Sequence, residues 1–259
     1  MEALTLLQQA FHHAAIDYRF LQPWQITDIN GNPQEVQRDG TGFVVASSFY
    51  GTEQGIPTGF AALSDSPVSC ATSVSALIAD NGQLLYQQNR NARDLFSWQQ
   101  QQGTRMPIQS ASLPADDYPQ NSAQQVRTSV VWYDGFGRIL QSVMQVPAGD
   151  AWQRTADGEL ATDDTGALVV VHADPRWAVS GRVEYDNKGL PVRQYQPWFI
   201  DSWQYVKDDA MRSQGYADRH YYDALGREVR VETANGYQRR SGYYPWFTVT
   251  EDENDTQTA

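Results

Sequence analysis

The chain contains Tyr133-Asp134-Gly135-Phe136-Gly137-Arg138, and this stretch recurs twice in looser form among its 259 residues. The further copies are Tyr185-Asp186-Asn187-Lys188-Gly189-Leu190 and Tyr222-Asp223-Ala224-Leu225-Gly226-Arg227. A pattern that recurs within one chain is typical of a fold that repeats one small structural unit. We therefore expect a recurring hairpin rather than a fold organised around a single active site.

Each copy has the residues that a tight hairpin turn requires. The Asp can accept hydrogen bonds from backbone amides two residues further on, and the Gly three residues after it can adopt positive φ. An apolar strand follows, as in Ile139-Leu140, so the local order is strand, turn, strand. We expect the repeat to be defined by a Tyr, an Asp, a Gly and usually an Arg in each copy: Tyr133, Asp134, Gly137, Arg138, Tyr185, Asp186, Gly189, Tyr222, Asp223, Gly226 and Arg227.

A degenerate fourth copy lies upstream, where Asp28 and Gly31 follow Trp24, and residues 39–43 carry a further turn without the usual Arg. The spacing between the clear copies is uneven, which argues against a regular propeller or a strict solenoid. The pattern predicts an all-β fold in which irregular hairpins form a curved β-sheet wall, with a short N-terminal helix over residues 2–15.

Composition excludes several classes of partner and site. The formal net charge of −12 argues against nucleic acid and anionic membrane, because phosphate binding needs clustered Lys and Arg. Cys70 is the single cysteine, so neither an internal disulfide nor a cysteine-based metal site can form. No run approaches about 18 apolar residues, and the first residues lack a classical signal peptide. We expect synthesis in the cytoplasm and no direct insertion into a membrane.

Changes in composition along the chain predict three regions. Residues 1–60 hold the helix and the first hairpins, and residues 61–126 form a variable excursion rich in Gln, Ser and Pro. Residues 127–259 form the main β-wall and end in an acidic, polar tail. Within this last region, Asp208–Gln214 can form one or two helical turns, since acidic residues favour a helix N-terminus.

Carboxylate pairs raise the question of catalysis without answering it. Asp163-Asp164 and Asp208-Asp209 are adjacent in sequence, which does not supply the separation that glycoside hydrolysis needs. Glu251 and Glu253 match a Glu-x-Glu pattern used by ADP-ribosyltransferases, but the other parts of such a site are not recognisable. The same tail lacks the ligand spacing of a calcium loop.

No other chemical group in the sequence forms a recognisable site. Adjacent His12 and His13 cannot chelate one metal from a helix, and His172 and His220 lie in strand-like segments. The chain has no nucleophile motif and no Gly-rich phosphate loop. We therefore expect no enzyme activity, no catalytic residue, no cofactor and no metal.

Longer tracts around these motifs resemble the C-terminal YD-repeat (RHS-type) region of the B component of bacterial insecticidal Toxin complexes. These tracts are residues 18–32, 133–138, 176–182, 185–193, 195–199, 221–228 and 245–255, so the resemblance spans nearly the whole chain. In that family the B and C components form a hollow β-shell that encloses the cytotoxic part of C, and the A component forms a pore.

The resemblance implies a structural segment of a B component, with the rest of B and the C component as its partners. The part of B that carries a propeller for docking to A has no counterpart here, so contact with A is expected to be indirect. Export as part of an extracellular toxin complex is implied as well. The alternative from another class is a free-standing β-domain that binds carbohydrate through aromatic rows, with Trp198 and Trp203 as candidates, since aromatic faces stack on sugars.

Overall fold

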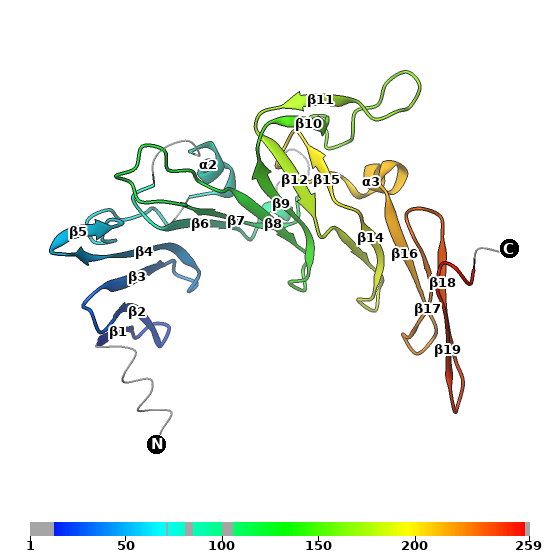
Figure 1. Ribbon diagram of the computed structural model, residues 1–259, viewed down its shortest axis with the longest axis horizontal. Coiled ribbons are helices and arrows are strands. Elements are labelled where there is room, and N and C mark those ends of the chain that lie inside the picture. The colour runs from blue at the N-terminus through cyan, green and yellow to red at the C-terminus, as the bar shows by residue number, and fades with distance from the viewer. Residues whose placement is uncertain (1–12, 71, 81–84, 100–105, 257–259) are drawn as a thin grey trace. The chain divides into compact units, whose positions relative to one another are not determined.

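The computed structural model describes residues 13–70, 72–80, 85–99 and 106–256 (Figure 1). The chain divides into two compact units. The first unit comprises residues up to 95 together with 109–129, and the second comprises 96–108 together with 130 onward. Nearly all regular structure in both units is β-strand, and the helices are short, which confirms the all-β prediction.

The first unit is built on an antiparallel sheet in the order β1-β2-β3-β4-β6-β7, with β5 paired to β4. Alternate residues of β7 are buried, as expected for a strand with one face on a core. The elements of this unit are β1 (His13–Asp17), β2 (Gln22–Thr27), β3 (Pro33–Arg38), β4 (Val44–Glu53), β5 (Ile56–Gly59), α2 (Val74–Ala79), β6 (Asn89–Asp94) and β7 (Ile108–Pro114).

The second unit contains two groups of strands. The first runs β8-β9-β12-β15-β10-β11 and comprises β8 (Ser129–Tyr133), β9 (Ile139–Val146), β10 (Gly149–Trp152), β11 (Val170–Ala173), β12 (Arg176–Ser180) and β15 (Trp198–Ile200). The second runs in the order β13 (Val183–Tyr185), β14 (Pro191–Tyr195), β16 (Ala217–Tyr222), β17 (Glu228–Glu232), β18 (Gln238–Tyr243) and β19 (Thr248–Glu251). This second group is an open sheet with β13 and β19 as its edges.

The core of the second unit combines aliphatic side chains with aromatic rings and one buried arginine. Trp132 is 0% exposed and stacks on Trp203, with ring centroids 6.4 Å apart. The guanidinium of Arg182 is buried over the ring of Tyr205 at 4.6 Å. Arg182 Nη2 also bonds to Asp208 Oδ1 at 2.6 Å, which links this core to the helix α3 (Asp208–Gln214).

The helix predicted over 208–214 is confirmed with the same bounds, and Asp208 and Asp209 occupy its first turn. The helix predicted over residues 2–15 lies mostly outside the described residues. Its last residues, 13–15, belong to β1, because their pairing with β2 satisfies the backbone groups that a helix would have bonded internally.

Strand β4 and the stretch 61–126 both differ from a simple row of short hairpins. Strand β4 continues through Gly51, although a Gly often marks an interruption in a strand. The stretch 61–126, predicted to be a variable excursion, contains α2 and contributes β6 and β7 to the sheet of the first unit. No helix among the described residues has the length and apolar character needed to cross a membrane.

Candidate functional site

The repeat motifs form identical turns. At Asp186, the side-chain Oδ1 accepts hydrogen bonds from the amides of Lys188 and Leu190, at 2.8 and 2.9 Å. The amide of Gly189 donates to the carbonyl of Asp186, and Gly189 has a φ of +84°. The turns at Asp134 and Asp223 have the same bonds and the same positive φ. The geometry is that expected from an Asp and a Gly three residues apart.

The same turn occurs eight times in the described residues. In each turn, the amide of the first residue donates a hydrogen bond to the carbonyl oxygen of the residue four positions later. The amide of that later residue donates in return to the side-chain oxygen of the first residue. Five begin outside the three clear motifs, at Asp28, Asp39, Thr155, Asp163 and Thr233. The sequence reading missed the last three as repeat turns, although a search for Asp or Thr followed by Gly three residues later finds them.

Tyrosine hydroxyls connect each repeat to the one before it. The hydroxyl of Tyr185 donates to the carbonyl of Ile139 at 3.2 Å, and that of Tyr222 donates to the carbonyl of Pro191 at 2.8 Å. In both cases the acceptor is the fifth residue after the Asp of the preceding turn. Tyr243 donates to the carbonyl of Glu228 at the same position. The Tyr of the motif is therefore a link between neighbouring hairpins.

The arginine that ends the motif joins its own turn to the next Tyr. Arg138 bonds to Asp134 through Nε at 2.6 Å, and its guanidinium lies 4.3 Å from the centre of the Tyr185 ring. Arg227 makes the same two contacts with Asp223 and the ring of Tyr243. Among the predicted repeat residues, Tyr185, Tyr222, Arg138 and Arg227 thus make side-chain contacts between hairpins of the second unit.

Gly137 gives a direct test of the turn geometry. We expect Gly137→Ala to lower the free energy of unfolding by about 1 to 2 kcal/mol, because a Cβ is disfavoured at its φ of +79°. Gly135→Ala is the matched control, since neither glycine has an atom within 4 Å of the position that a Cβ would take, and only Gly137 has positive φ. Equal losses in urea unfolding for the two variants would contradict the assignment.

Turn carboxylates are expected to make stability depend on pH. Hydrogen bonds from the side chain and amide of Thr165 hold the pKa of Asp163 below its usual value, and those from Arg227 do the same for Asp223. A lowered folded-state pKa stabilises the fold above the unfolded-state pKa of about 3.9, and this contribution is lost as pH falls through the folded-state value.

The chain supplies its own control for this effect, because Thr155 and Thr233 make the same amide bond with a hydroxyl that does not titrate in this range. We expect Asp163→Thr to reduce the loss of thermal stability between pH 6 and pH 3. An unchanged acid sensitivity in melting curves would count against a role for Asp163.

Strand β19 is an edge of the second sheet: it pairs with β18 on one side only, and all four of its residues are exposed. Tyr244 donates its amide to the carbonyl of Phe247 across the β18–β19 turn. In an antiparallel hairpin, hydrogen-bonded and non-hydrogen-bonded residue pairs alternate along the two strands. Counting from the Tyr244–Phe247 pair, the pair Ser241–Thr250 is a non-hydrogen-bonded one, so the N–H and C=O of Thr250 point away from β18. An exposed row of such groups can accept another strand.

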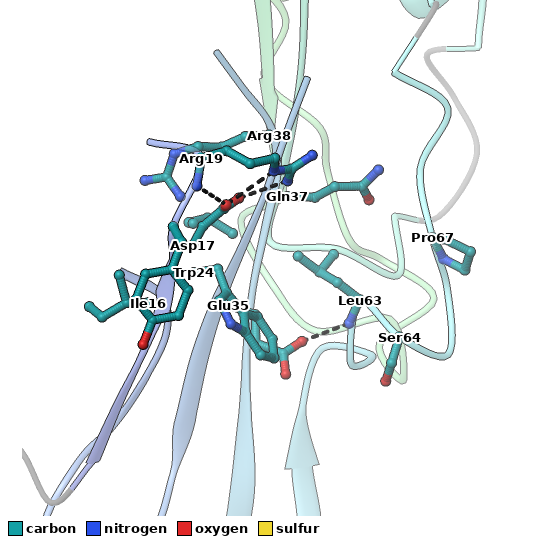
Figure 2. Close-up of a pocket in the computed structure, with 12 residues that line it drawn as sticks. Ile16, Asp17, Arg19, Trp24, Glu35, Gln37, Arg38, Leu63, Ser64 and Pro67 are labelled. Atoms are coloured by element: carbon teal, nitrogen blue, oxygen red, sulfur yellow. Dashed lines mark hydrogen bonds and ion pairs between the residues drawn. The ribbon is translucent and has the colours of Figure 1, made fainter. Parts of the chain in front are cut away.

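The first unit contains a groove of about 640 Å³ that includes Asp17 and Glu35 in its lining (Figure 2). Its carboxylates already have partners. Asp17 accepts from Nη2 of Arg19 at 2.7 Å, and the Arg19 side chain lowers the pKa of Asp17. Glu35 is buried and accepts from Tyr50 at 2.6 Å and from the amide of Leu63 at 2.9 Å.

These hydrogen bonds make Glu35 a structural link between neighbouring segments of the first unit. Burial and the hydrogen bond to Glu35 raise the pKa of Tyr50 to about 12, so this hydroxyl remains a donor at neutral pH. Glu35 also accepts from Gln25 on the other side, and so joins β2, β3, β4 and the loop at Leu63. The groove therefore presents structural contacts rather than an acid and a base facing a substrate.

The carboxylates that raised the question of catalysis are dispersed. Asp163 closes a turn, Asp208 binds Arg182, and Glu253 forms an ion pair with Arg239 at 3.2 Å. Asp209 is exposed beside Arg212. Nowhere in the described ranges do three His, Cys, Asp or Glu side chains gather closely enough to hold a metal ion.

The two aromatic residues suggested for sugar stacking pack against other tryptophans. Trp198 is 6% exposed and stacks on Trp152, with ring centroids 6.0 Å apart. Trp203 packs on buried Trp132. Replacing either by Ala would disturb packing, so the exposed Trp98 and Trp246 are the proper positions for a glycan-binding test.

Solved structures share this architecture. The chain matches the crystal structure of TcdB2-TccC3 with a TM-score of 0.86 and 43% identity over 94% of this chain and 11% of that one. The chain is homologous to part of a Tc toxin complex component. A TcdB2-TccC3 structure without the hypervariable C-terminal region matches with a TM-score of 0.85 and 36% identity, over 94% of this chain and 14% of that one.

The Tc holotoxin pore of Photorhabdus luminescens, in a TccC3 variant, matches at 36% identity and a TM-score of 0.86, over 94% of this chain and 13% of that one. The chain therefore spans 11 to 14% of the length of these Tc chains. No family model and no curated protein sequence matches the chain. These similarities relate the chain to part of the Tc toxin complex proteins.

Proposed function

We propose that the chain is a non-enzymatic structural segment of a Tc toxin B component, and that its YD hairpins form part of a β-shell around a cytotoxic partner. The main observation behind this proposal is that 94% of this chain matches a stretch that makes up only 11% of a much longer Tc chain. A segment of a larger wall needs strand edges that can pair with further strands, and β19 presents such an edge.

The proposal assigns the chain two direct partners, the rest of the B component and the C component that carries the enclosed toxin. The similar structures contain TcdB2 together with TccC3, which supports an assembly of this kind. The pore-forming A component is an indirect partner. The complex acts outside the bacterial cell, and the chain neither binds nucleic acid nor inserts into the membrane itself.

Complementation in trans tests this proposal. The tagged chain is co-expressed with a B component that lacks the corresponding segment and with its C component. We expect both proteins to co-purify with the tag, because the open edges regain their neighbours. Recovery of the chain without either protein, when the intact B component binds C under the same conditions, would contradict the proposal.

A substitution in the edge strand β19 tests the pairing of this edge in the same co-expression experiment. Thr250→Pro removes an N–H that points to the free edge and leaves the bonds to β18 in place, so we expect it to weaken assembly. Thr250→Ser keeps this N–H and is the matched control.

Expression of the chain alone gives a separate expectation. Without neighbours, the exposed edge and apolar side chains are expected to make the chain self-associate, with an apparent stability that depends on protein concentration. Light scattering and thermal melts at several concentrations measure this. A sharp, reversible melt of a compact monomer, independent of concentration, would show that the segment is self-sufficient.

A further inference from the structure

One face of the sheet formed by β14, β16, β17 and β18 carries a concentration of arginine side chains. Residues directly opposite each other on paired strands share a face of the sheet, as do alternate residues along one strand. Arg193 lies opposite Arg219, and Arg230 lies opposite Arg240. Tyr221 stands two residues after Arg219 and lies opposite Arg230, so both pairs are on the same face. We call this surface the arginine face and define it by Arg193, Arg219, Arg230 and Arg240.

Both pairs place two positive charges side by side on neighbouring strands. Like charges directly opposite each other destabilise a sheet. The chain has 31 Asp and Glu residues against 19 Lys and Arg, so the clustering does not follow from an excess of basic residues. Departures from the rules of local stability are expected at functional positions. The arrangement therefore indicates a role other than holding this sheet together.

The carboxylates near the arginine face compensate only part of its charge. Glu184 forms ion pairs with Arg193 at 3.5 Å and with Arg212 of α3 at 2.9 Å. Glu232 forms an ion pair with Arg230 at 3.4 Å. Each carboxylate thus serves one arginine of a directly opposed pair and leaves the other without an ionic partner.

Arg219 and Arg240 are the two arginines left over. Arg219 is exposed, and its side chain has neither an ion pair nor a hydrogen bond within the described ranges. Arg240 is also exposed, and it donates to the neutral amide of Gln238 at 2.9 Å. Nε of Arg230 is buried without a hydrogen-bond partner in the part of the chain that the structure describes. The face therefore has guanidinium donors that are free to bind an anion.

A hollow of about 320 Å³ adjoins the arginine face at Arg219. Its lining includes Glu232 and Gln238 of the same face, together with Tyr216, which is 65% exposed. A guanidinium can hold a carboxylate through two parallel hydrogen bonds, and an exposed aromatic ring can pack against an apolar group beside it. The hollow offers both kinds of contact to one ligand.

The acidic residues on the arginine face favour a protein partner over a nucleic acid or a sulfated polysaccharide. Glu184, Glu232 and Glu251 lie opposite arginines of this face. A uniformly charged polymer brings anionic groups close to these carboxylates, and such contacts between like charges are costly. The carboxylates of a peptide can instead be separated by neutral residues, so that they meet the arginines and avoid the acids.

We propose that the arginine face binds an acidic segment of a partner protein, with Arg219 and Arg240 holding its carboxylates. A carboxylate placed between two opposed guanidinium groups replaces their repulsion by two attractive contacts. This inference goes beyond the proposed function, because it concerns a face of the sheet and not the strand edges through which a wall would continue.

Peptide binding to the tagged full chain tests the proposal. The chain is immobilised at low density, which keeps its copies apart, and is titrated at low ionic strength with a peptide in which Glu alternates with Ser. A peptide of equal length with Lys in place of Glu is the comparison. We expect only the Glu peptide to bind, and to bind more weakly as salt is added, because salt screens exposed charges.

Arg219→Gln combined with Arg240→Gln removes two charges from the face. We expect the Kd for the Glu peptide to rise at least about tenfold, since charge-assisted hydrogen bonds are lost. The matched control combines Lys188→Gln in the β13–β14 turn with Arg239→Gln, which lies opposite Val231 on the other face. This control should bind within about twofold of the parent. Arg219→Lys with Arg240→Lys should recover part of the affinity, because Lys keeps the charge but not the planar donors.

Thermal melts of the same variants separate binding from a structural role. The double Gln variant of the face removes one charge from each like-charge pair, so it should melt at or above the temperature of the parent chain. A melting temperature well below those of the parent and the control variant would assign the arginines to the fold and overturn the proposal.

Three binding results would also overturn the proposal. The first is the absence of binding by the Glu peptide at millimolar concentration, and the second is an equal loss of affinity in the face and control variants. The third is tighter binding of heparin or a single-stranded oligonucleotide through the same arginines, which would assign the face to a polyanion. Each of these results leaves the proposed function standing, because complementation in trans tests the function separately.

Discussion

Arg182→Met is expected to lower the free energy of unfolding by about 3 to 5 kcal/mol, because it leaves buried acceptors without a donor. Arg182 is 1% exposed, and its Nη1 donates to Gln141 Oε1 at 2.7 Å and to the carbonyl of Val206 at 3.0 Å. Gln141 is itself buried, so water cannot replace the lost bond. Asp208, the ionic partner, is half exposed and can be solvated.

The loss is large relative to the total stability of a typical domain, about 5 to 15 kcal/mol. Pulse proteolysis in urea at low protein concentration measures it while self-association is suppressed. Arg182→Lys is the control, since it keeps the charge but not the planar set of donors, and it should recover only part of the stability. A Met variant as stable as the parent would show that the Arg182 contacts do not hold the core together.

Trp132→Ala is expected to cost about 3 to 5 kcal/mol, the range for removing a large buried aromatic side chain. Trp132 is fully buried, and its ring packs on Trp203 and Tyr205. Its indole nitrogen has no hydrogen-bond partner among the described residues, so the loss arises from packing and from the cavity that remains.

Trp246→Ala is the matched control for this prediction, because the same side chain is removed from an exposed turn. We expect a change within about 0.5 kcal/mol for the chain alone. The same urea and proteolysis assay compares the two variants. A similar loss for both, or no loss for Trp132→Ala, would contradict the assignment of Trp132 to the core.

The turns were the most predictable part of the fold, because their determinants are local. An Asp and a Gly three residues apart specify the hydrogen bonds and the positive φ at Gly189 regardless of what surrounds the hairpin. The helix at Asp208–Gln214 was predictable for the same reason, since its acidic first turn is a local signal.

Contacts between distant segments could not be read from the sequence. Ile139 and Tyr185 are joined only because neighbouring hairpins meet, and nothing local marks Ile139 as an acceptor. Arg182 had no motif that indicated burial, and its partners come from β9, the Val206 loop and α3. In residues 13–15 a local signal was misleading: the apolar spacing is helical, but these residues pair with β2 as a strand.

The candidate site was predictable in kind but not in arrangement. The sequence indicates the turn residues of the repeat, whereas the contacts of Tyr185 and Tyr222 with the preceding hairpins depend on which hairpins are neighbours. Trp198 was proposed as a sugar platform because it is aromatic, but stacking on Trp152 buries it. Residue type alone does not distinguish a core aromatic from an exposed one.

Protease protection of the C component tests the central claim most directly. Complexes are assembled from C and the shortened B component, with and without this chain, and treated with trypsin. If the chain is a segment of the enclosing wall, the toxic part of C should be degraded without the chain and protected with it. Equal protection in both preparations would contradict a place for this chain in the wall.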